Sequence, residues 1–468
     1  MTDSLKKQIF TTLIVVLALS ACKITNKYES PHLKTAGLYR DQKSTDTTVM
    51  ADIPWQNLFA DATLKQLIQE GLDQNIDLKN AIQNIIQAEA TLNQTKLANL
   101  PGLTADASAA RNKTSEAGLN FHPGININTL TNTFLLQLST SWEADIWGKI
   151  SSSKRAALAS YLQTDAAKRA VQTQLIAAIA NNYYSLMALD RQLEITELTL
   201  KKRIENVETM KALKEAAVVN GAAVVQSEAN RYAAAVSIPD LKQSIRITEN
   251  VLSLLLARVP GNINRNKLSE QHVAATLSTG VAAQLLQNRP DVQAAEFAFR
   301  ASFEDTNLAR TYFYPTLTLT ARSGFSNLEL KDFFGNAVFY NLLAGITQPI
   351  FAKGVNKARL IRTLAAQTQT LNEFKQTLLI AGQEVSNALF AHQMASEKES
   401  LRAKQIIALE KAVNFTEELL RYSSATNYTD VLTSEQSLLS AQLAGVNDRL
   451  QQLQAVVNLY QALGGGWK

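Results

Sequence analysis

Few residues of this 468-residue chain carry the chemistry that catalysis or metal binding requires. There is one cysteine, Cys22, so neither a disulfide nor a cysteine-based metal site can form within the chain. The four histidines, His32, His122, His272 and His392, are isolated from one another in sequence. The chain contains no His-Glu-x-x-His, no Gly-x-Ser-x-Gly and no glycine-rich phosphate loop. We therefore expect neither an enzyme nor a bound metal or cofactor.

Concentrated charge is also scarce. Charged residues make up 19% of the chain and aromatic residues 7%, and the net charge is +5. Lysine and arginine form no dense run interleaved with aromatic residues, so we do not expect nucleic-acid binding. The abundance of alanine, leucine and glutamine favours long, moderately apolar helices over a compact sheet protein.

The N-terminus has the features of a secretory signal. Lys6 and Lys7 precede an apolar run from Ile9 to Leu19, which has the length of a signal-peptide core and is too short to span a bilayer comfortably. Residues 1–21 are therefore predicted to be removed. Because Lys6, Lys7 and Asp3 leave with them, the net charge of the mature chain falls from +5 to about +4.

Cys22 follows this run within Leu19-Ser20-Ala21-Cys22, which resembles a bacterial lipobox. The resemblance implies that the Cys22 thiolate takes a diacylglycerol, and Lys23, in place of an aspartate, favours passage to the outer membrane. The alternative is a buried cysteine in an ordinary cleaved signal or membrane anchor. Residues 22–54 are predicted to form a lipidated, extended tether and an equatorial segment.

The remainder of the chain is predicted to be an internal duplication. Glu143–Lys149 corresponds to Thr347–Lys353, and Leu256–Gly261 corresponds to Tyr460–Gly465, both at an offset of 204 residues. These pairs divide the body into a first repeat at 55–261 and a second at 262–468. Each copy is expected to be half of one architecture.

Each repeat contains one predicted β-hairpin, at 102–143 and at 315–349. The expected strands are Leu103–Arg111, Thr131–Trp142, Thr316–Phe325 and Val338–Gln348, in which apolar and polar residues alternate. Strands of about ten residues fit a tilted transmembrane β-strand. Alternation alone leaves open a soluble sheet that packs one face on a helix.

The long helices carry apolar residues at alternating steps of three and four. This spacing predicts a helix from about Val355 to Tyr422, and another through Leu439, Val446, Leu453 and Tyr460. At 1.5 Å per residue the first would be roughly 100 Å long. Such spacing directs one side of a helix toward a partner helix. A plain coiled-coil rod is the alternative, but it leaves the alternating segments unexplained.

Several segments together resemble the OprM-like branch of the TolC family of outer-membrane efflux factors. They are Trp55–Phe59, Asn75–Leu78, Arg289–Glu296, Tyr314–Leu317 and Leu463–Trp467. They occur in order from residue 55 to the end of the chain, and the Arg-Pro-Asp-Val segment at Arg289 is among the most specific signatures of the family.

The resemblance implies a mainly α fold with a small β part. In this family a homotrimer contributes four strands per protomer to one shared transmembrane β-barrel, which continues as a long α-helical barrel across the periplasm. A closed barrel leaves no open strand edge in hydrocarbon. The resemblance also implies a passive, gated exit duct for drugs and other small toxic compounds, located in the outer membrane.

The implied partners are a periplasmic adaptor protein and an inner-membrane, proton-driven pump of the RND type. One alternative is the outer-membrane duct of a type I protein secretion system, which has the same architecture. Another is a periplasmic coiled-coil scaffold without a pore. We expect no cofactor other than the lipid on Cys22.

Four residues are candidates for roles in the channel. Asp430, in Asp430-Val431-Leu432, corresponds to the family's aspartate beside the closed periplasmic aperture, although it has the alternative of capping its helix. Tyr422 corresponds to the family's tyrosine that holds neighbouring helices in the closed state. Trp142 and Trp147 are candidates for an interfacial aromatic belt, with core packing as the alternative.

The aperture segment also departs from the family. The turn at Ser423–Thr429 is one residue shorter than its TolC counterpart. Asn427 stands where the family has a gate-bonding arginine, and Thr433 stands where it has a second aspartate. These departures put a salt-bridge latch in doubt.

Overall fold

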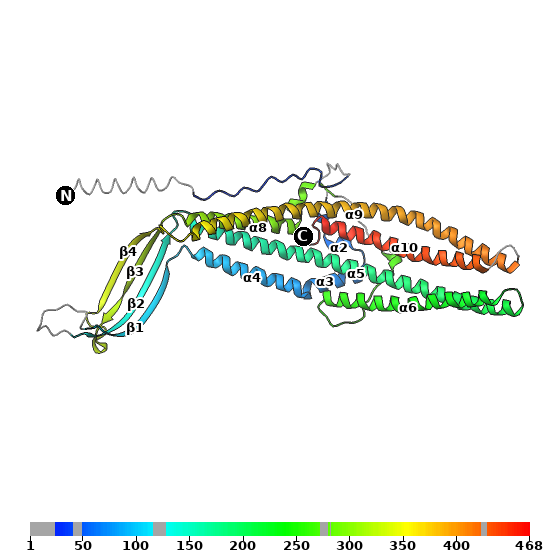
Figure 1. The fold of residues 1–468 in the computed structure, drawn as a ribbon, viewed down its shortest axis with the longest axis horizontal. Helices are drawn as coiled ribbons and strands as arrows, with labels where there is room; N and C mark the ends of the chain where they lie inside the picture. The colour runs from blue at the N-terminus through cyan, green and yellow to red at the C-terminus, as the bar shows by residue number, and fades with distance from the viewer. Residues whose placement is uncertain (1–23, 41–48, 116–127, 272–278, 281, 423–427) are drawn as a thin grey trace. The chain divides into compact units, whose positions relative to one another are not determined.

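The computed structural model describes residues 24–40, 49–115, 128–271, 279–280, 282–422 and 428–468. Cys22 lies outside the described residues. The chain separates into two compact units. Unit 1 comprises Met1–Pro31, Ile86–Gln163 and Glu296–Asn372, and unit 2 comprises His32–Ile85, Thr164–Ala295 and Glu373–Lys468. Figure 1 shows the elements along the chain.

The same order of elements occurs twice. In the first half, α4 (Ile76–Leu97) is followed by β1 (Gly102–Lys113), β2 (Leu130–Ala144), α5 (Lys149–Glu215) and α6 (Gly221–Leu255). In the second half, the order is α8 (Pro290–Thr311), β3 (Thr316–Asn327), β4 (Val338–Thr347), α9 (Val355–Tyr422) and α10 (Tyr428–Ala462). The predicted helix at Val355–Tyr422 and all four predicted strands are confirmed.

Corresponding elements also have similar lengths. Helices α5 and α9 have 67 and 68 residues, and α6 and α10 have 35 each. The shorter elements are η1 (Met50–Asp52), α2 (Trp55–Leu58), α3 (Ala62–Gln74), η3 (Leu268–Glu270), η4 (Ala282–Gln284), α7 (Leu285–Asn288) and η5 (Leu330–Asp332).

A short turn joins α5 and α6. Helix α5 ends at Glu215, and α6 begins at Gly221. The side chain of Asn220 caps this helix, because its Oδ1 accepts a hydrogen bond from the backbone N–H of Ala223 at 3.1 Å. Ala217 takes a positive φ of 57°, which reverses the chain without a glycine.

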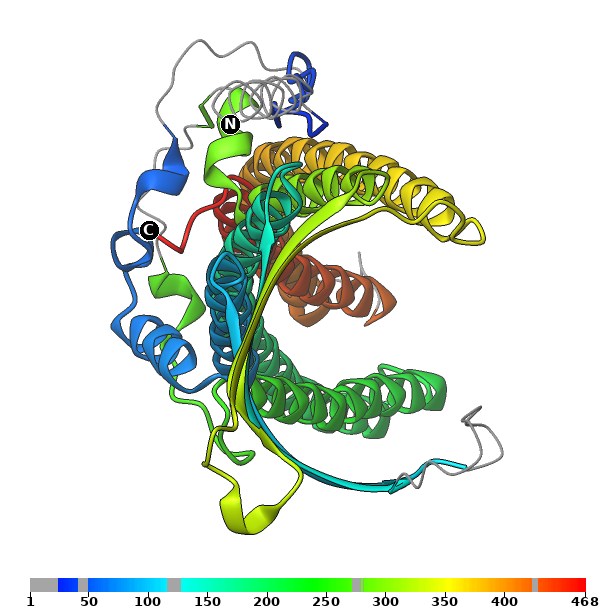
Figure 2. The same cartoon turned by 90° about the vertical axis from the view of Figure 1, so that its left-hand side faces the viewer.

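The four strands form one antiparallel sheet in the order β1-β2-β3-β4. The two predicted hairpins are joined through β2 and β3, whose pairing runs from Phe134↔Asn327 to Ala144↔Leu317. Figure 2 shows that this sheet is strongly curved. The whole sheet belongs to unit 1.

Asp61 organises the polar part of the unit 2 core. Its carboxylate caps α3 and accepts hydrogen bonds from Tyr183 Oη at 2.9 Å, Gln271 Nε2 at 2.8 Å and Asn266 Nδ2 at 3.0 Å. Burial by itself would raise the pKa of Asp61, but these donors outweigh it and lower the pKa. A buried carboxylate that has only neutral donors therefore stays ionised and ties three separate segments together.

The two signature motifs of the second half meet in unit 2. The Arg289 guanidinium donates to the carboxylates of Asp291 and Glu384 and, at 3.0 Å, to the carbonyl oxygen of Ala462. Trp467 Nε1 donates to the carbonyl of Asn288 at 3.0 Å. The Arg-Pro-Asp-Val segment thus holds the C-terminal end of the chain.

Gly464 makes this approach possible. Its φ is +86°, and a Cβ there would lie 2.3 Å from the carbonyl oxygen of Asn288. The glycine run Gly464–Gly466 follows the end of α10 at Ala462.

The first described residues of the predicted tether, 24–31, lie against α8 in unit 1. Asn26 and Asn307 form a reciprocal pair, in which the Asn26 N–H donates to Asn307 Oδ1 at 3.0 Å and Asn307 Nδ2 donates to Asn26 O at 2.9 Å. The Tyr28 ring packs edge-on against Phe303 at a centroid distance of 5.5 Å. Residues 24–31 have no regular secondary structure, as expected, but they are fixed to a helix.

Candidate functional site

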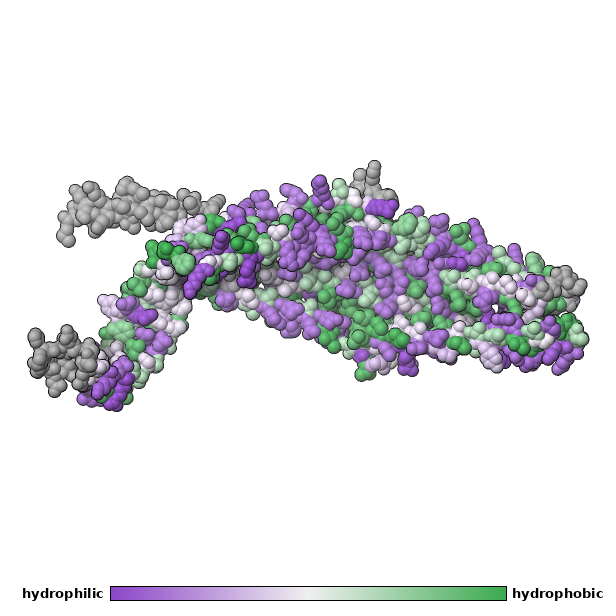
Figure 3. Space-filling view, viewed as in Figure 1, coloured by the Kyte–Doolittle hydropathy of each residue, from purple (hydrophilic) through white to green (hydrophobic). Residues whose placement is uncertain are grey.

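One face of the sheet is apolar and is not covered by the rest of unit 1. The register places odd-numbered residues of β1 and β3 on the same face as even-numbered residues of β2 and β4. This apolar face has two charged residues at the end of β1, Arg111 and Lys113, and a few polar positions such as Asn132 and Thr140. Its other positions are mainly hydrophobic: Leu103, Ala105, Ala107, Ala109, Phe134, Leu136, Leu138, Trp142, Leu317, Leu319, Phe325, Val338, Tyr340, Leu342 and Ile346. Leu342 is 76% exposed. Figure 3 shows hydrophobic surface over the strands and where they meet the helices.

The opposite face is mainly polar. It carries Thr104, Asp106, Ser108, Asn112, Thr131, Thr133, Gln137, Ser139, Ser141, Glu143, Thr316, Thr318, Thr320, Arg322 and Asn341. Leu135, Phe339 and Leu343 are the large apolar exceptions on this polar face. A sheet with one face toward lipid and one toward water has this division.

Both edges of the sheet are open. No described strand pairs with the outer side of β1 or of β4. Unpaired N–H and C=O groups along an edge strand are a template for another strand, and in hydrocarbon they cannot stay unpaired. The outer edges of β1 and β4 therefore leave room for further strands to pair.

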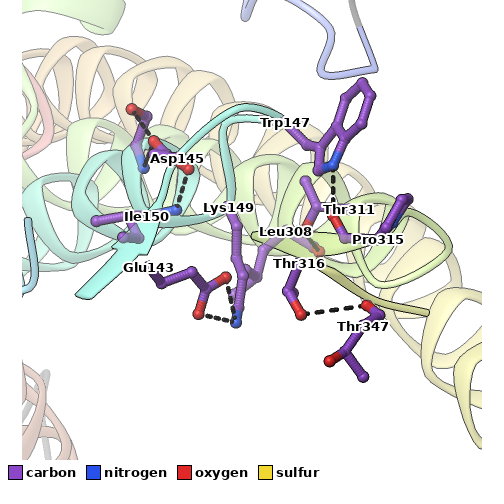
Figure 4. Close-up of polar contacts among 11 residues, drawn as sticks. Glu143, Asp145, Trp147, Lys149, Ile150, Leu308, Thr311, Pro315, Thr316 and Thr347 are labelled. Atoms are coloured by element: carbon purple, nitrogen blue, oxygen red, sulfur yellow. Dashed lines mark hydrogen bonds and ion pairs between the residues drawn. The ribbon is translucent and has the colours of Figure 1, made fainter. Parts of the chain in front are cut away.

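The two candidate tryptophans lie where the sheet ends. Trp142 is on the apolar face of β2, and its Nε1 donates to the carbonyl of Asn99 at 2.8 Å. Trp147 donates from Nε1 to the carbonyl of Pro315 at 2.7 Å, and its ring lies 5.2 Å from that of Tyr314 (Figure 4). Both are partly exposed and hydrogen-bonded, which suits the boundary between lipid and water.

The residues between Trp142 and α5 fix the change from strand to helix. Asp145 accepts the backbone N–H groups of Ile150 at 2.8 Å and Ser151 at 2.9 Å, the first donors of α5. Lys149 Nζ lies 2.9 Å from Glu143 Oε1 (Figure 4). Gly148 has a φ of +75°, so this tight turn favours glycine.

The two aperture candidates lie at the far ends of α9 and α10 in unit 2. Tyr422 is the last residue of α9 and is 85% exposed. Asp430 is the third residue of α10 and is exposed. The alternative that Asp430 caps this helix is wrong, because α10 begins at Tyr428; the aspartate instead lies within the first turn, where the helix dipole favours a negative charge. Asn427 lies outside the described residues.

A polar cluster near the same ends could not be predicted from the sequence. Arg203 of α5 is buried and donates to the carbonyl of Asn230 in α6 at 2.6 Å and to Gln436 Oε1 in α10 at 2.7 Å. Burial lowers the pKa of Arg203, and burial also raises the pKa of Glu435, which accepts a bond from Asn206 at 2.7 Å. No sequence motif marks these residues, because their spacing is that of ordinary helix positions.

Large apolar side chains are exposed along α6 and along α9 within unit 2. On α6 they are Val225, Tyr232, Val236, Ile247, Val251 and Leu254, and on α9 they are Leu379, Ile380, Phe390, Leu401, Ile407, Phe415 and Leu419. Extended apolar stripes on long helices mark surfaces that another helix covers.

The described residues contain neither a helix that could span a membrane nor a group of side chains that could hold a metal ion. No described helix has the length and hydrophobicity to cross a membrane. In the same ranges, no group of three or more His, Cys, Asp or Glu side chains is placed to hold a metal ion.

Comparison with protein families finds one match over both halves of the chain. The family described as "Outer membrane efflux protein" matches residues 67–258 and 281–465. These two ranges cover most of the chain.

Curated relatives match over almost the full length. The "Toluene efflux pump outer membrane protein TtgC" of Pseudomonas putida is 28% identical, covering 98% of this chain and 96% of the relative. The "Probable outer membrane lipoprotein SilC" of Salmonella typhimurium is also 28% identical, covering 97% of each.

Solved structures of outer-membrane channels have the same fold. The open state of the MtrE channel of Neisseria gonorrhoeae superposes with a TM-score of 0.84 at 27% identity, covering 96% of this chain and 99% of that one. The OprN channel superposes with a TM-score of 0.85 at 24% identity, covering 95% and 100%. At that lower identity the likeness concerns the fold alone.

Proposed function

This chain belongs to the outer membrane efflux protein family, and from that membership we propose that it forms the exit channel of a tripartite efflux pump. It is an outer-membrane efflux protein and not an enzyme. The observation that carries the channel is the sheet in unit 1, which has an uncovered apolar face, a polar face and two open edges. In the proposed channel, the adaptor and the RND-type pump supply the energy, and the channel itself is passive.

The open edges support a homotrimer. Four strands from each of three copies would close into a twelve-stranded barrel with the apolar face toward lipid and the polar face toward the bore. The outer edge of β4 in one copy would pair with β1 of the next. The match of one family to both halves, and the equal lengths of α6 and α10, support the duplication that provides two hairpins per copy.

The exposed stripes on α6 and α9 support a helical barrel formed by several copies. Within a copy, Arg203 joins α5 to α10, and Arg402 of α9 pairs with Asp448 of α10 at 2.9 Å. The apolar stripes on α6 and α9 remain without a partner, so we propose that α6 of one copy packs against α9 of the next.

Two alternatives remain to be compared with this function. The secretion duct is not favoured, because the curated relatives carry efflux-pump names. A pore-free scaffold does not explain the exposed apolar face of the sheet. The proposed substrates are drugs and other small toxic compounds; which of them are exported depends on the pump.

Conductance and susceptibility together test the channel. Purified protein in planar bilayers is expected to conduct, whereas a scaffold gives no current. In a deletion strain that expresses the cognate pump, susceptibility to dyes, detergents and antibiotics should rise and should be restored by the intact gene. A protein that neither conducts nor restores resistance is not an efflux channel.

We propose that the mature chain begins at Cys22 and carries its lipid there. The support is the lipobox, together with the lipoprotein name of the relative SilC. Residues that follow Cys22 are fixed near the end of the sheet, since a Cβ on Gly148 would lie 3.4 Å from Cγ2 of Thr25. A lipid attached three residues earlier would enter the membrane beside the barrel.

Substitution of Cys22 with serine tests this assignment. The variant should lose palmitate labelling because the thiolate that takes the lipid is absent, and its signal should remain uncleaved by the lipoprotein peptidase. Metabolic labelling and the mass of the N-terminus provide the measurement. Continued labelling of the Cys22→Ser protein would place the lipid elsewhere.

We propose that Asp430 lines the periplasmic aperture and that Tyr422 contacts a neighbouring copy in the closed state. Both are exposed at the ends of α10 and α9, where an isolated chain leaves them uncovered. Three carboxylates around one aperture attract cations. In the bilayer measurement above, block by divalent cations should therefore weaken in Asp430→Asn; unchanged block leaves Asp430 only its place in the first turn of the helix.

A further inference from the structure

Two arginines lie close together near the start of α9 in unit 1. The polar face carries a single arginine, Arg322, in the middle of β3. Two more arginines, Arg359 and Arg362, follow in the first two turns of α9. We call Arg359 and Arg362 the arginine pair.

Contacts where the sheet meets α5 and α9 place the arginine pair on the side of the polar face. Glu143 belongs to that face, and Lys149 Nζ is 2.9 Å from its Oε1. The same Nζ lies 5.4 Å from the centroid of the Tyr312 ring, and the guanidinium carbon of Arg359 lies 3.7 Å from that centroid. Arg359 is therefore linked to Glu143 on the polar face through three successive contacts.

Arg362 lies on the same side of α9 as Arg359, since the two are three residues apart. A hollow of about 760 Å³ runs along this side and is lined by both arginines together with Thr363, Gln369 and small residues. Arg362 is exposed, and no ion pair joins it to any residue of the described ranges. The hollow is therefore open to a solute.

Three carboxylates of unit 1 already have hydrogen-bond or ion-pair partners. Glu143 pairs with Lys149 at 2.9 Å, and Glu304 pairs with Arg155 at 2.8 Å. Asp145 accepts the first N–H groups of α5. None of these three carboxylates forms an ion pair with the arginine pair.

Helix stability does not account for this charge. The first turn of α9 contains no acidic residue, although the helix dipole favours negative charge there and disfavours arginine and lysine. Stacking on Tyr312 holds the Arg359 guanidinium in place. A role outside the helix explains the arginine pair better than folding does.

We propose that the arginine pair lines the bore just inside the sheet and that three copies form a cationic belt that attracts anionic solutes, such as small carboxylates or sulfonates. This inference rests on the proposed trimeric channel. Charges that line a water-filled bore raise the local concentration of ions of opposite sign and set the preference between anions and cations.

Reversal potentials of single channels in a potassium chloride gradient test the belt. The double variant Arg359→Gln/Arg362→Gln should lower the chloride-to-potassium permeability ratio about two- to fivefold, because six charges leave the bore of a trimer. Raising the salt concentration should shrink the difference through screening.

Lys357 offers a matched control on the same helix. It is exposed, it lies two residues from Arg359 and so on the other side of α9, and Lys357→Gln removes one charge, as Arg362→Gln does. Arg362→Gln should shift the ratio and Lys357→Gln should leave it near the wild-type value. Equal shifts, or no shift in the double variant, would overturn the belt while leaving the channel intact; a wild-type protein without conductance would overturn both.

Discussion

Replacing Leu342 with arginine is expected to abolish assembly in the outer membrane, whereas the same substitution one residue later is expected to be tolerated. Leu342 lies in the middle of β4 on the apolar face and is 76% exposed. Leu343 is 61% exposed and lies on the polar face. The two leucines are neighbours on the same strand, have the same size and are both exposed. They differ mainly in the face of the sheet on which they lie.

The expected difference follows from the cost of charge in hydrocarbon. Arginine on the lipid side of a barrel strand costs about 2–4 kcal/mol near the middle of the bilayer. Three copies carry the substitution in a homotrimer, so the penalty for Leu342→Arg is about three times larger. Leu343→Arg would point into a water-filled bore and would cost little.

Separation of outer and inner membranes, followed by electrophoresis of unheated samples, measures the trimer that reaches the outer membrane. Trimer should disappear for Leu342→Arg and persist for Leu343→Arg. If both variants assemble equally well, the sheet does not face lipid, and the soluble-sheet alternative is correct. If only the Leu343→Arg variant fails to form trimer, the face that carries Leu343 is the one toward lipid.

The elements of this fold could be predicted from the sequence because each carries a simple periodicity. Alternation of apolar residues predicted the four strands, and steps of three and four predicted α9. The junction of β2 and β3 could not be predicted in this way. It depends on pairing between residues more than 170 positions apart, such as Ala144 and Leu317. The alternation of residues within one strand does not indicate which distant strand pairs with it.

The polar contacts of the candidate site could be predicted only in part. Trp142 and Trp147 were predicted as interfacial residues because aromatic residues beside a strand end suggest a membrane boundary. Both lie at the end of the sheet, and their place at the membrane boundary stays a prediction. Arg203 and Glu435 gave no signal, since a polar residue in a long helix usually faces solvent. Their burial arises from the packing of α5 against α6 and α10, which the sequence of one helix does not specify.

Replacing Arg289 with alanine is expected to be among the most damaging substitutions in unit 2. Arg289 is 7% exposed and is the only link in these contacts between Asp291, Glu384 and the carbonyl of Ala462. Burial alone would lower the pKa of Arg289, but the two carboxylates raise it, so the guanidinium is charged at every pH at which the protein folds.

Removal of the guanidinium leaves two carboxylates close together without a cation and one carbonyl without a donor. Breaking a buried ion pair from one side costs about 3–5 kcal/mol, and the partial exposure of Asp291 and Glu384 places this site at about 3 kcal/mol. The C-terminal end should also detach, because Ala462 would lose its bond and the segment around Asn288 would no longer be held against Gly464.

Arg258 provides the control for this prediction. It pairs with Glu70 at 3.3 Å in the same unit, but both side chains are 36% exposed. An exposed pair contributes at most about 1 kcal/mol, so Arg258→Ala should change the melting temperature little. Thermal unfolding of the detergent-solubilised proteins compares the two variants, and hydrogen exchange of residues 460–468 reports the C-terminal end separately.

Arg289→Lys distinguishes charge from geometry at the same position. Lysine retains the positive charge but lacks the planar fork that serves Asp291 with two donors and Glu384 and Ala462 with a third. We expect this variant to recover less than half of the lost stability and to leave exchange at the C-terminal end elevated. Full recovery by lysine would mean that the signature arginine acts as a charge, and that the joining of the two motifs does not depend on its hydrogen bonds.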